Sequence, residues 1–244
     1  MLKYAMKVFL KKLLPVSFIY SYRKIRFVVK SWLFLPQFVK IVANGKQARL
    51  STRGFPTANI ALWLGTQDVL DYEPDERALL EPFFKSARCF WDIGAQVGFY
   101  SIVAALHGVP EILAVDIDER YCEEIKRHAK ANNLNIHVHK AATGLSGTEV
   151  TFENFGATST QMAVSLDDLV KLTCQKPDLI KIDIDGGEIA TLTGAPQLFQ
   201  SADGPILLIE FLAQHNNTSE LKTILERYGY RMVKKAGNNT LWLK

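Results

Sequence analysis

The segment FWDIGAQVGFYS, from Phe90 to Ser101, places an acidic residue and two glycines where an apolar run ends. Gly94 permits a sharp turn, and Gly98 permits the backbone to approach a ligand closely. The carboxylate of Asp92 would repel a phosphate and attract an ammonium group. The helix expected after Gly98 would offer free N–H groups and a positive dipole end, which suit a carboxylate or a phosphate. The segment therefore predicts a ligand-binding loop.

The spacing of the glycines argues against a dinucleotide. The loop reads Gly-Ala-Gln-Val-Gly, one glycine short of the Gly-x-Gly-x-x-Gly fingerprint, and Gln96 and Val97 hinder the approach of a pyrophosphate. A ligand with an amino acid zwitterion would satisfy both Asp92 and the helix end. Asp116 ends a second apolar run, where nucleotide sites hold the ribose hydroxyls. An amino acid joined to adenosine is S-adenosylmethionine, so the residues predict that cofactor.

Strands and helices must alternate to place these residues at one edge of a sheet. Runs such as ILAVD, LIKID and ILLIEF are apolar almost throughout, as is typical of parallel strands covered by helices on both faces. A helix with Pro74 in its first turn is expected before the first strand. We expect strands at 89–93, 111–116, 136–141, 179–183, 206–211, 230–234 and 240–243. Helices are expected to begin at 99 and to span 119–132, 166–172, 189–199 and 219–228. The prediction is a doubly wound, mostly parallel seven-stranded α/β sheet.

Several segments resemble the FkbM-type S-adenosylmethionine-dependent methyltransferases. DIGAQVGFYS is similar to the family's Asp-x-Gly-Ala-Asn-x-Gly-x-Tyr-Ser, and KIDIDGGE at Lys181–Glu188 is similar to its Lys-Ile-Asp-Val-Glu-Gly-Ala-Glu. AVDID, VSLDDL and YEPDERALL also fit, so the resemblance extends from about Tyr72 to the C-terminus. The chain departs from the family pattern at Gln96, Asp185 and Gly187, which replace Asn, Glu and Ala.

The resemblance implies a Rossmann-like class I fold and methyl transfer, most often to an oxygen of a carbohydrate, glycan or related natural product. The residues expected to bind S-adenosylmethionine are Asp92, Gly94, Ala95, Gly98, Phe99, Tyr100, Ser101, Asp116, Ile117, Ala141 and Ala142. A base assists when the nucleophile is an alcohol. The candidates at the ends of the fourth and fifth strands and in the loop beyond are Asp183, Asp185, Glu210 and His215. We expect no metal.

Each of these residues also has a structural interpretation. Asp92 and Asp116 could cap loops, Asp183 and Asp185 could cap the helix that begins near Glu188, and Lys181 could form a buried ion pair. Two other functions stay open. A nicotinamide-dependent oxidoreductase would bind NAD, and a non-catalytic adaptor on a degenerate methyltransferase fold would act at a membrane surface.

The charge of the chain is divided unevenly. Twelve Lys and Arg and no Asp or Glu lie between residues 1 and 67, so this part carries +12 and the remainder −8. We therefore predict a basic helical extension, residues 1–67, before a methyltransferase domain, residues 68–244. Lys3, Lys7 and Lys11 recur at helical spacing beside an apolar face. Residues 1–40 are expected to contact an anionic membrane surface or to pack on the domain; an organellar transit peptide is a further alternative.

Other classes of partner and compartment are excluded. The extension has no nucleic-acid motif and more aliphatic than hydrogen-bonding side chains, which argues against nucleic acid. No apolar run reaches the roughly 18 residues of a spanning helix. Cys89, Cys122 and Cys174 form no disulfide or zinc pattern, which favours a reducing, cytoplasmic compartment. The sequence does not predict an oligomeric state.

Overall fold

The structure is a computed structural model that describes residues 35–54, 57–58, 60–61, 64–65, 68–154, 157–211 and 218–244. The predicted amphipathic helix near the N-terminus and the candidate base His215 lie outside the described residues. Within these ranges, none of the helices combines the length and the apolar character that crossing a membrane requires.

A seven-stranded sheet forms the centre of the molecule. Its strand order is β11-β12-β10-β9-β3-β4-β5. β12 runs antiparallel to both neighbours, and the other strand pairs of this sheet are parallel. The strands are β3 (Cys89–Ile93), β4 (Glu111–Asp116), β5 (His137–Lys140), β9 (Leu179–Ile182), β10 (Ile206–Glu210), β11 (Arg231–Ala236) and β12 (Asn239–Leu243). The strand order reverses beside β3, because β4 lies on one side of it and β9 on the other. The predicted sheet is confirmed.

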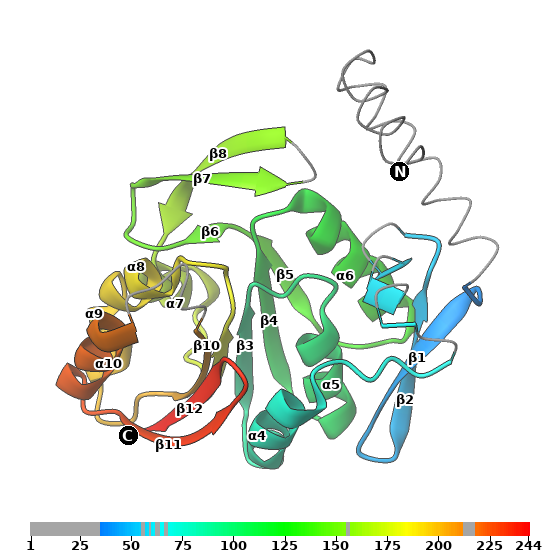
Figure 1. Cartoon of the computed structure of the whole chain (residues 1–244), viewed down its shortest axis with the longest axis horizontal. Coiled ribbons are helices and arrows are strands. Elements are labelled where there is room, and N and C mark those ends of the chain that lie inside the picture. The colour runs from blue at the N-terminus through cyan, green and yellow to red at the C-terminus, as the bar shows by residue number, and fades with distance from the viewer. Residues whose placement is uncertain are drawn as a thin grey trace, which may run out of the picture.

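Helices cover both faces of the sheet (Figure 1). On one face lie α4 (Pro74–Phe84), α5 (Phe99–His107) and α6 (Glu119–Ala131). On the other lie α7 (Leu166–Thr173), α8 (Glu188–Thr193), α9 (Pro196–Gln200) and α10 (Thr218–Arg227). α8 and α9 replace the single helix expected over 189–199. Pro196 begins a new helix there because proline is favoured in a first turn but not in a helix interior.

Alternate strand residues enter two separate hydrophobic cores. Phe90, Leu208 and Leu241 pack with the α4 and α5 side, whereas Trp91 and Ile180 pack with the α7 to α10 side. Because strand side chains alternate between faces, Asp92 and Lys181 lie on the α4 and α5 side.

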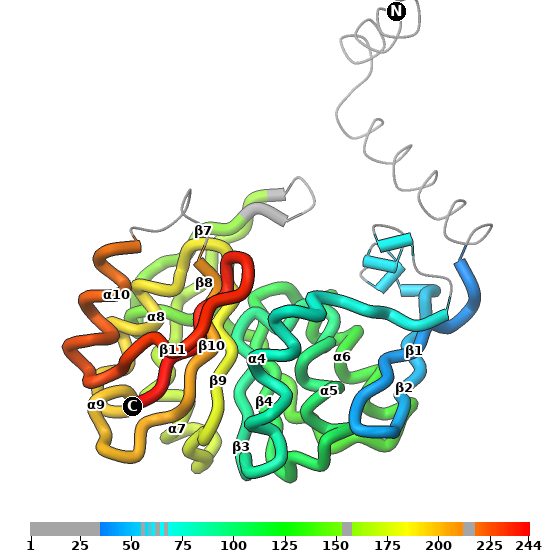
Figure 2. The backbone as a smooth tube through the Cα atoms, turned by 60° about the horizontal axis from the view of Figure 1, so that its bottom comes forward, coloured from blue at the N-terminus to red at the C-terminus, as the bar shows by residue number. Residues whose placement is uncertain are grey.

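A β-hairpin lies within the predicted N-terminal extension. β1 (Phe38–Ala43) and β2 (Lys46–Ser51) pair antiparallel across Asn44-Gly45, whose φ angles of 50° and 70° suit a two-residue hairpin turn. Val39, Ile41 and Leu50 are fully buried in the core shared with α5. Figure 2 shows the hairpin beside α5 and α6, at the end of the molecule opposite α10. These residues were expected to be helical and are strands. The division at residue 67 stays a prediction.

A second small sheet lies over the carboxyl ends of the central strands (Figure 1). It consists of β6 (Ala142–Thr143), β7 (Glu149–Asn154) and β8 (Ala157–Val164), in the order β6-β8-β7. This sheet was not predicted from the sequence. The small sheet begins directly after β5, and it covers the edge of the central sheet where the expected ligand loop lies.

Candidate active site

A cavity of about 920 Å³ opens at the carboxyl ends of β3, β4 and β9, beneath β7. This volume is within the range of small-molecule sites. The lining residues come from five regions of the chain: Ile93, Gly94 and Gln96; Val115 to Asp118 and Tyr121; Ala141 to Thr143; Val150 to Phe152; and Asp183 to Gly187. The cavity thus lies at the switch point of the sheet, where open α/β folds bind their ligands.

Gly94 brings the loop after β3 against the end of β9. Its φ is +83°, and a Cβ atom here would lie 1.8 Å from the carbonyl oxygen of Asp183. The N–H of Gly94 donates to the carbonyl of Val115 at 2.9 Å, which ties the same loop to β4. Any side chain at this position would separate the elements that form the cavity.

Asp116 lies in the cavity wall at the end of β4. It is 6% exposed, and its two carboxylate oxygens accept the backbone N–H groups of Gln96 and Asp118, each at 2.8 Å. Burial raises the pKa of Asp116 to about 6, although these hydrogen bonds oppose the shift. The carboxylate is held rigidly where the ribose contact was predicted.

Asp92 turns away from the cavity. Its Oδ2 accepts the backbone N–H of Ser101 at 2.9 Å and the Ser101 hydroxyl at 2.7 Å. Burial raises the pKa of Asp92, and Lys181 on the adjacent strand opposes that rise. The side chain holds the start of α5, as the capping interpretation expected. Its contact with a ligand ammonium stays a prediction.

The predicted cofactor residues divide into two groups. Gly94, Asp116, Ile117, Ala141 and Ala142 line the cavity. The others lie behind its wall or in the first turn of α5, and most are buried: Asp92, Ala95, Gly98, Phe99, Tyr100 and Ser101. Sequence reasoning identified the loop but could not show which way each side chain points.

Several lining residues were not predicted. Tyr121 comes from α6, Thr143 from β6, and Val150, Thr151 and Phe152 from β7. The residue types of the β7–β8 region, rich in Thr and Val, are typical of strands. Its position over the cavity follows only from the fold.

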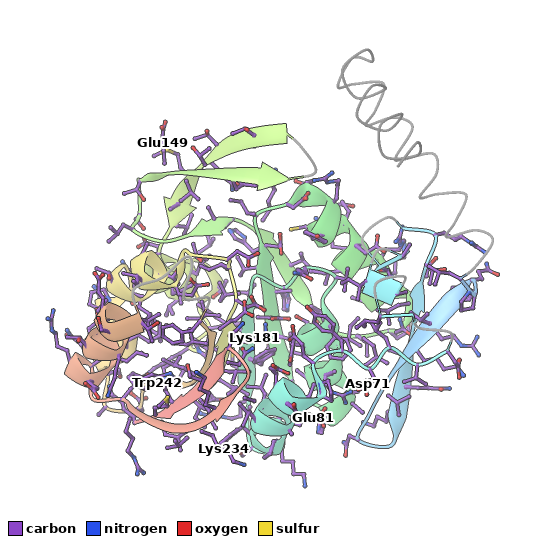
Figure 3. All side chains as sticks on the ribbon, viewed as in Figure 1. Asp71, Glu81, Glu149, Lys181, Lys234 and Trp242 are labelled. Atoms are coloured by element: carbon purple, nitrogen blue, oxygen red, sulfur yellow. The ribbon has the colours of Figure 1, made fainter. Side chains whose placement is uncertain are left out.

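A buried lysine joins the acidic residues beside the cavity. Lys181 is 2% exposed, and its Nζ lies 2.5 Å from Oδ2 of Asp183 and 4.6 Å from the centre of the Tyr100 ring. Figure 3 places this lysine in the interior of the molecule. Burial lowers the pKa of Lys181, but Asp183, Glu73 and Asp92 outweigh burial and raise it to about 12. The lysine therefore stays charged.

Asp183 and Glu210 form a carboxyl pair at the ends of adjacent strands. Burial favours the protonated form of Asp183, yet Lys181 and a hydrogen bond from Glu210 lower its pKa below the usual value. Burial, followed by the hydrogen bond and charge of Asp183, raises the pKa of Glu210 to about 8. Near neutral pH the pair therefore holds one proton, which lies on Glu210.

Tyr72 and Glu73, just before α4, interact with the charged group formed by Lys181, Asp183 and Glu210. The Tyr100 hydroxyl donates to Oε2 of Glu73 at 2.9 Å. Burial raises the pKa of Glu73 while Lys181 opposes the shift, and the charges of Asp183 and Glu210 both act on Tyr72. The cluster thus combines residues that are far apart in the sequence.

The remaining candidates have distinct positions. Asp185 lines the cavity with a φ of +54°. Glu188 is buried and accepts the N–H groups of Ile184 and Gly186, so it holds the loop that carries Asp185. In the part of the chain that the structure describes, no group of three or more His, Cys, Asp or Glu is placed to hold a metal.

The model of the methyltransferase FkbM domain matches residues 51–232, which is most of the chain. The chain belongs to the FkbM methyltransferase family. Membership confirms the predicted resemblance, the class I fold and S-adenosylmethionine as the methyl donor. No curated protein sequence matches this FkbM chain significantly.

Solved structures of other methyltransferases are similar to this FkbM chain. An O-methyltransferase from Bacillus cereus in complex with SAH has 16% identity, a TM-score of 0.47, and a match over 76% of this chain and 86% of its own. An O-methyltransferase family protein from Burkholderia thailandensis has 14% identity and a TM-score of 0.48. The match covers 70% of this chain and 54% of the Burkholderia chain. The ribosomal protein L11 methylase from Lactobacillus delbrueckii has 19% identity and a TM-score of 0.43. The match covers 64% of this chain and 69% of the methylase chain.

Proposed function

We propose that this methyltransferase transfers its methyl group to a hydroxyl of a carbohydrate, glycan or related natural product. The observation that carries the proposal is the carboxyl pair formed by Asp183 and Glu210. It lies at the ends of β9 and β10, and Asp183 also lines the cavity. A hydroxyl nucleophile must lose a proton, and an ionised carboxylate beside the methyl donor can accept it.

The cavity fits the donor in size and in chemistry. Asp116 offers a carboxylate for two ribose hydroxyls, and Ile117, Tyr121 and Ala141 offer an apolar wall for adenine. Asp116, Asp118, Asp183 and Asp185 line the cavity with negative charge, whose potential suits a cationic sulfonium. We assign these residues to the donor because they surround the space beside Gly94.

The residues of the chain would act mainly by position. When bound, S-adenosylmethionine supplies a methyl carbon on a positively charged sulfur. This carbon would be the electrophile for the acceptor oxygen, with the sulfur as its leaving group, and Asp183 would take the hydroxyl proton. Lys181 keeps Asp183 ionised and in place, so the alignment of base and nucleophile supplies much of the rate.

A ligand-stability experiment tests the cofactor site. S-adenosylmethionine, S-adenosylhomocysteine and NAD are added in parallel to the full chain. At 100 times its dissociation constant, a bound ligand stabilises the folded state by about 2.7 kcal/mol. We expect stabilisation by the first two ligands only; stabilisation by NAD alone would favour the oxidoreductase.

Replacement of the base tests the reaction. Asp183→Asn should retain binding of S-adenosylhomocysteine while methyl transfer to an alcohol acceptor falls by about 100-fold or more. Unchanged transfer by this variant would exclude Asp183 as the base.

We also infer that residues 1–40 contact an anionic membrane surface, since the charge of residues 1–67 is +12. Sedimentation with anionic and with neutral vesicles tests this. Equal recovery of the protein in both pellets, or its absence from both, would contradict the inference.

A further inference from the structure

The outer face of the β1–β2 hairpin carries exposed apolar side chains. Residues along β1 alternate between the two faces, so Val39 and Ile41 pack in the core shared with α5 while Phe38 and Val42 point away from it. Phe38 is 43% exposed and Val42 is 42% exposed. Single exposed apolar residues are common on protein surfaces, but several on one face indicate a contact surface.

Val69 widens this outer face. It forms a parallel bridge with Lys40, and the N–H of Lys40 donates to the carbonyl of Asp68 at 2.7 Å. Bridged residues share one face, so Val69, which is 45% exposed, lies beside Lys40. Phe38 and Val42 precede and follow Lys40 on the same face of β1. Lys40 therefore has an apolar neighbour on three sides.

A second cation lies on the fourth side. The strand register places Arg49 of β2 directly opposite Lys40, and like charges in this position destabilise an antiparallel pair. Asp68 compensates Lys40, because its Oδ1 lies 3.1 Å from Nζ. In the part of the chain that the structure describes, no carboxylate forms an ion pair with Arg49. An anionic group bound at this face would offset the repulsion.

The sequence around the hairpin indicates what this partner is. Residues 35–67 contain no Asp or Glu and four basic residues, Lys40, Lys46, Arg49 and Arg53. The other eight basic residues of the N-terminal part lie between 1 and 34, and that segment ends just before β1. Cations mixed with apolar side chains on one face suit a lipid surface with acidic headgroups.

We propose that the outer face of the hairpin, formed by Phe38, Lys40, Val42, Arg49 and Val69, docks on an anionic membrane surface. The apolar side chains enter the boundary between headgroups and acyl chains, and Arg49 contacts lipid phosphate. The inference rests on the proposed contact of residues 1–40 with such a membrane and adds the folded domain to it. Because the hairpin packs on α5, docking would also fix the orientation of the cavity relative to the lipid.

A fluorescent label at Val42 tests the docking. Val42→Cys carries nitrobenzoxadiazole in a full chain with Cys174→Ser, since Cys174 is exposed and the other two cysteines are buried. Met232→Cys is the matched control. Met232 is 50% exposed and lies in the basic strand β11, away from the hairpin in Figures 1 and 2. With vesicles of phosphatidylserine and phosphatidylcholine in equal parts, the emission at position 42 should rise and shift to shorter wavelength, and that at position 232 should not change.

Two substitutions separate the contributions of charge and apolar contact. Arg49→Gln should weaken vesicle binding about fivefold, because each basic residue near an anionic surface contributes about 1 kcal/mol. Phe38→Ser should weaken it by a similar factor through lost apolar burial. Arg231→Gln, exposed in β11, should leave binding unchanged. Asn132 contacts only the backbone of Arg49, so the melting temperature of Arg49→Gln should equal or exceed that of the wild type.

Each outcome decides the proposal. Sedimentation with the vesicles but no change at position 42, or an equal change at positions 42 and 232, overturns docking through the hairpin and leaves the contact of residues 1–40 intact. Failure to sediment contradicts both. An apolar environment at position 42 before vesicles are added also overturns the proposal. If dilution abolishes this signal, a second copy covers the face; if it does not, residues 1–34 of the same chain do.

Discussion

Lys181, buried in β9, and Asp183, the residue that follows this strand, form an ion pair with 2.5 Å between Nζ and Oδ2. Removing one partner of such a pair leaves the other charge buried and uncompensated. We expect Lys181→Met to lower the free energy of unfolding by about 3–5 kcal/mol. Chemical denaturation measures the loss. Lys171→Met is the matched control, since its ion pair with Asp168 is exposed and should contribute less than about 1 kcal/mol. Equal losses in both variants would contradict the buried role.

The proton on Glu210 makes stability depend on pH. The pKa of this residue rises from 4.5 to about 8 on folding, so the folded state binds more protons between these values. Its contribution to stability is complete below pH 4.5 and is lost as the pH rises to about 8. Glu210→Gln stays neutral, so its melting temperature should match the wild type at about pH 5 and exceed it at about pH 9. Glu149→Gln, at an exposed position labelled in Figure 3, should show no such difference.

Replacing Gly94 by alanine has two effects, backbone strain and a steric clash, and a comparison with Gly108 separates them. Its positive φ alone costs an alanine about 1–2 kcal/mol, but Gly94→Ala also drives a Cβ atom into the Asp183 carbonyl. Gly108→Ala is the control, since its φ is +92° and no atom lies within 4 Å of the new Cβ. We expect Gly94→Ala to lose binding of S-adenosylhomocysteine, measured by calorimetry, and Gly108→Ala to retain it. Wild-type affinity in both would show that the loop does not shape the site.

Asp116 is expected to contribute to affinity for the donor and not only to the fold. Asp116→Asn should weaken binding of S-adenosylhomocysteine by about 10- to 100-fold, because hydrogen bonds to a charged group contribute about 1.5–3 kcal/mol. Asp167 offers a matched control. It is also buried and accepts two backbone N–H groups, those of Gln197 and Leu198. Asp167→Asn should reduce stability but leave the affinity unchanged. A similar fall in affinity for both variants would contradict the ribose contact.

The central sheet could be predicted from the sequence because its inner strands β3, β4, β9 and β10 are mostly buried and almost wholly apolar. β3 and β4 begin and end where the apolar runs do. The switch-point loop could also be predicted, because Gly94 and Gly98 both need positive φ angles, which glycine adopts readily. The local sequence was therefore sufficient to predict features that a single strand or loop forms by itself.

The parts that were not predicted depend on contacts between distant segments. The helical spacing of lysines near the N-terminus suggested a helical extension, yet Asn44-Gly45 and the alternation of Val39 and Ile41 are hairpin signals. Asp183 and Glu210 come from the ends of two strands far apart in the sequence, so only the pairing of β9 with β10 brings them together. Asp92 shows the same limit. Its residue type indicated a role in this loop, but the sequence could not show that its side chain turns away from the cavity.

The hairpin β1–β2 sets a lower limit for any truncation of the protein. The family match begins at residue 51, where β2 ends. A fragment that started there would lack Val39, Ile41 and Leu50 and would leave the apolar side of α5 open to water. It would also lose the two hydrogen bonds that join the Asn132 side chain to the backbone of Arg49. Shortened versions intended for crystallisation should therefore begin before Leu35.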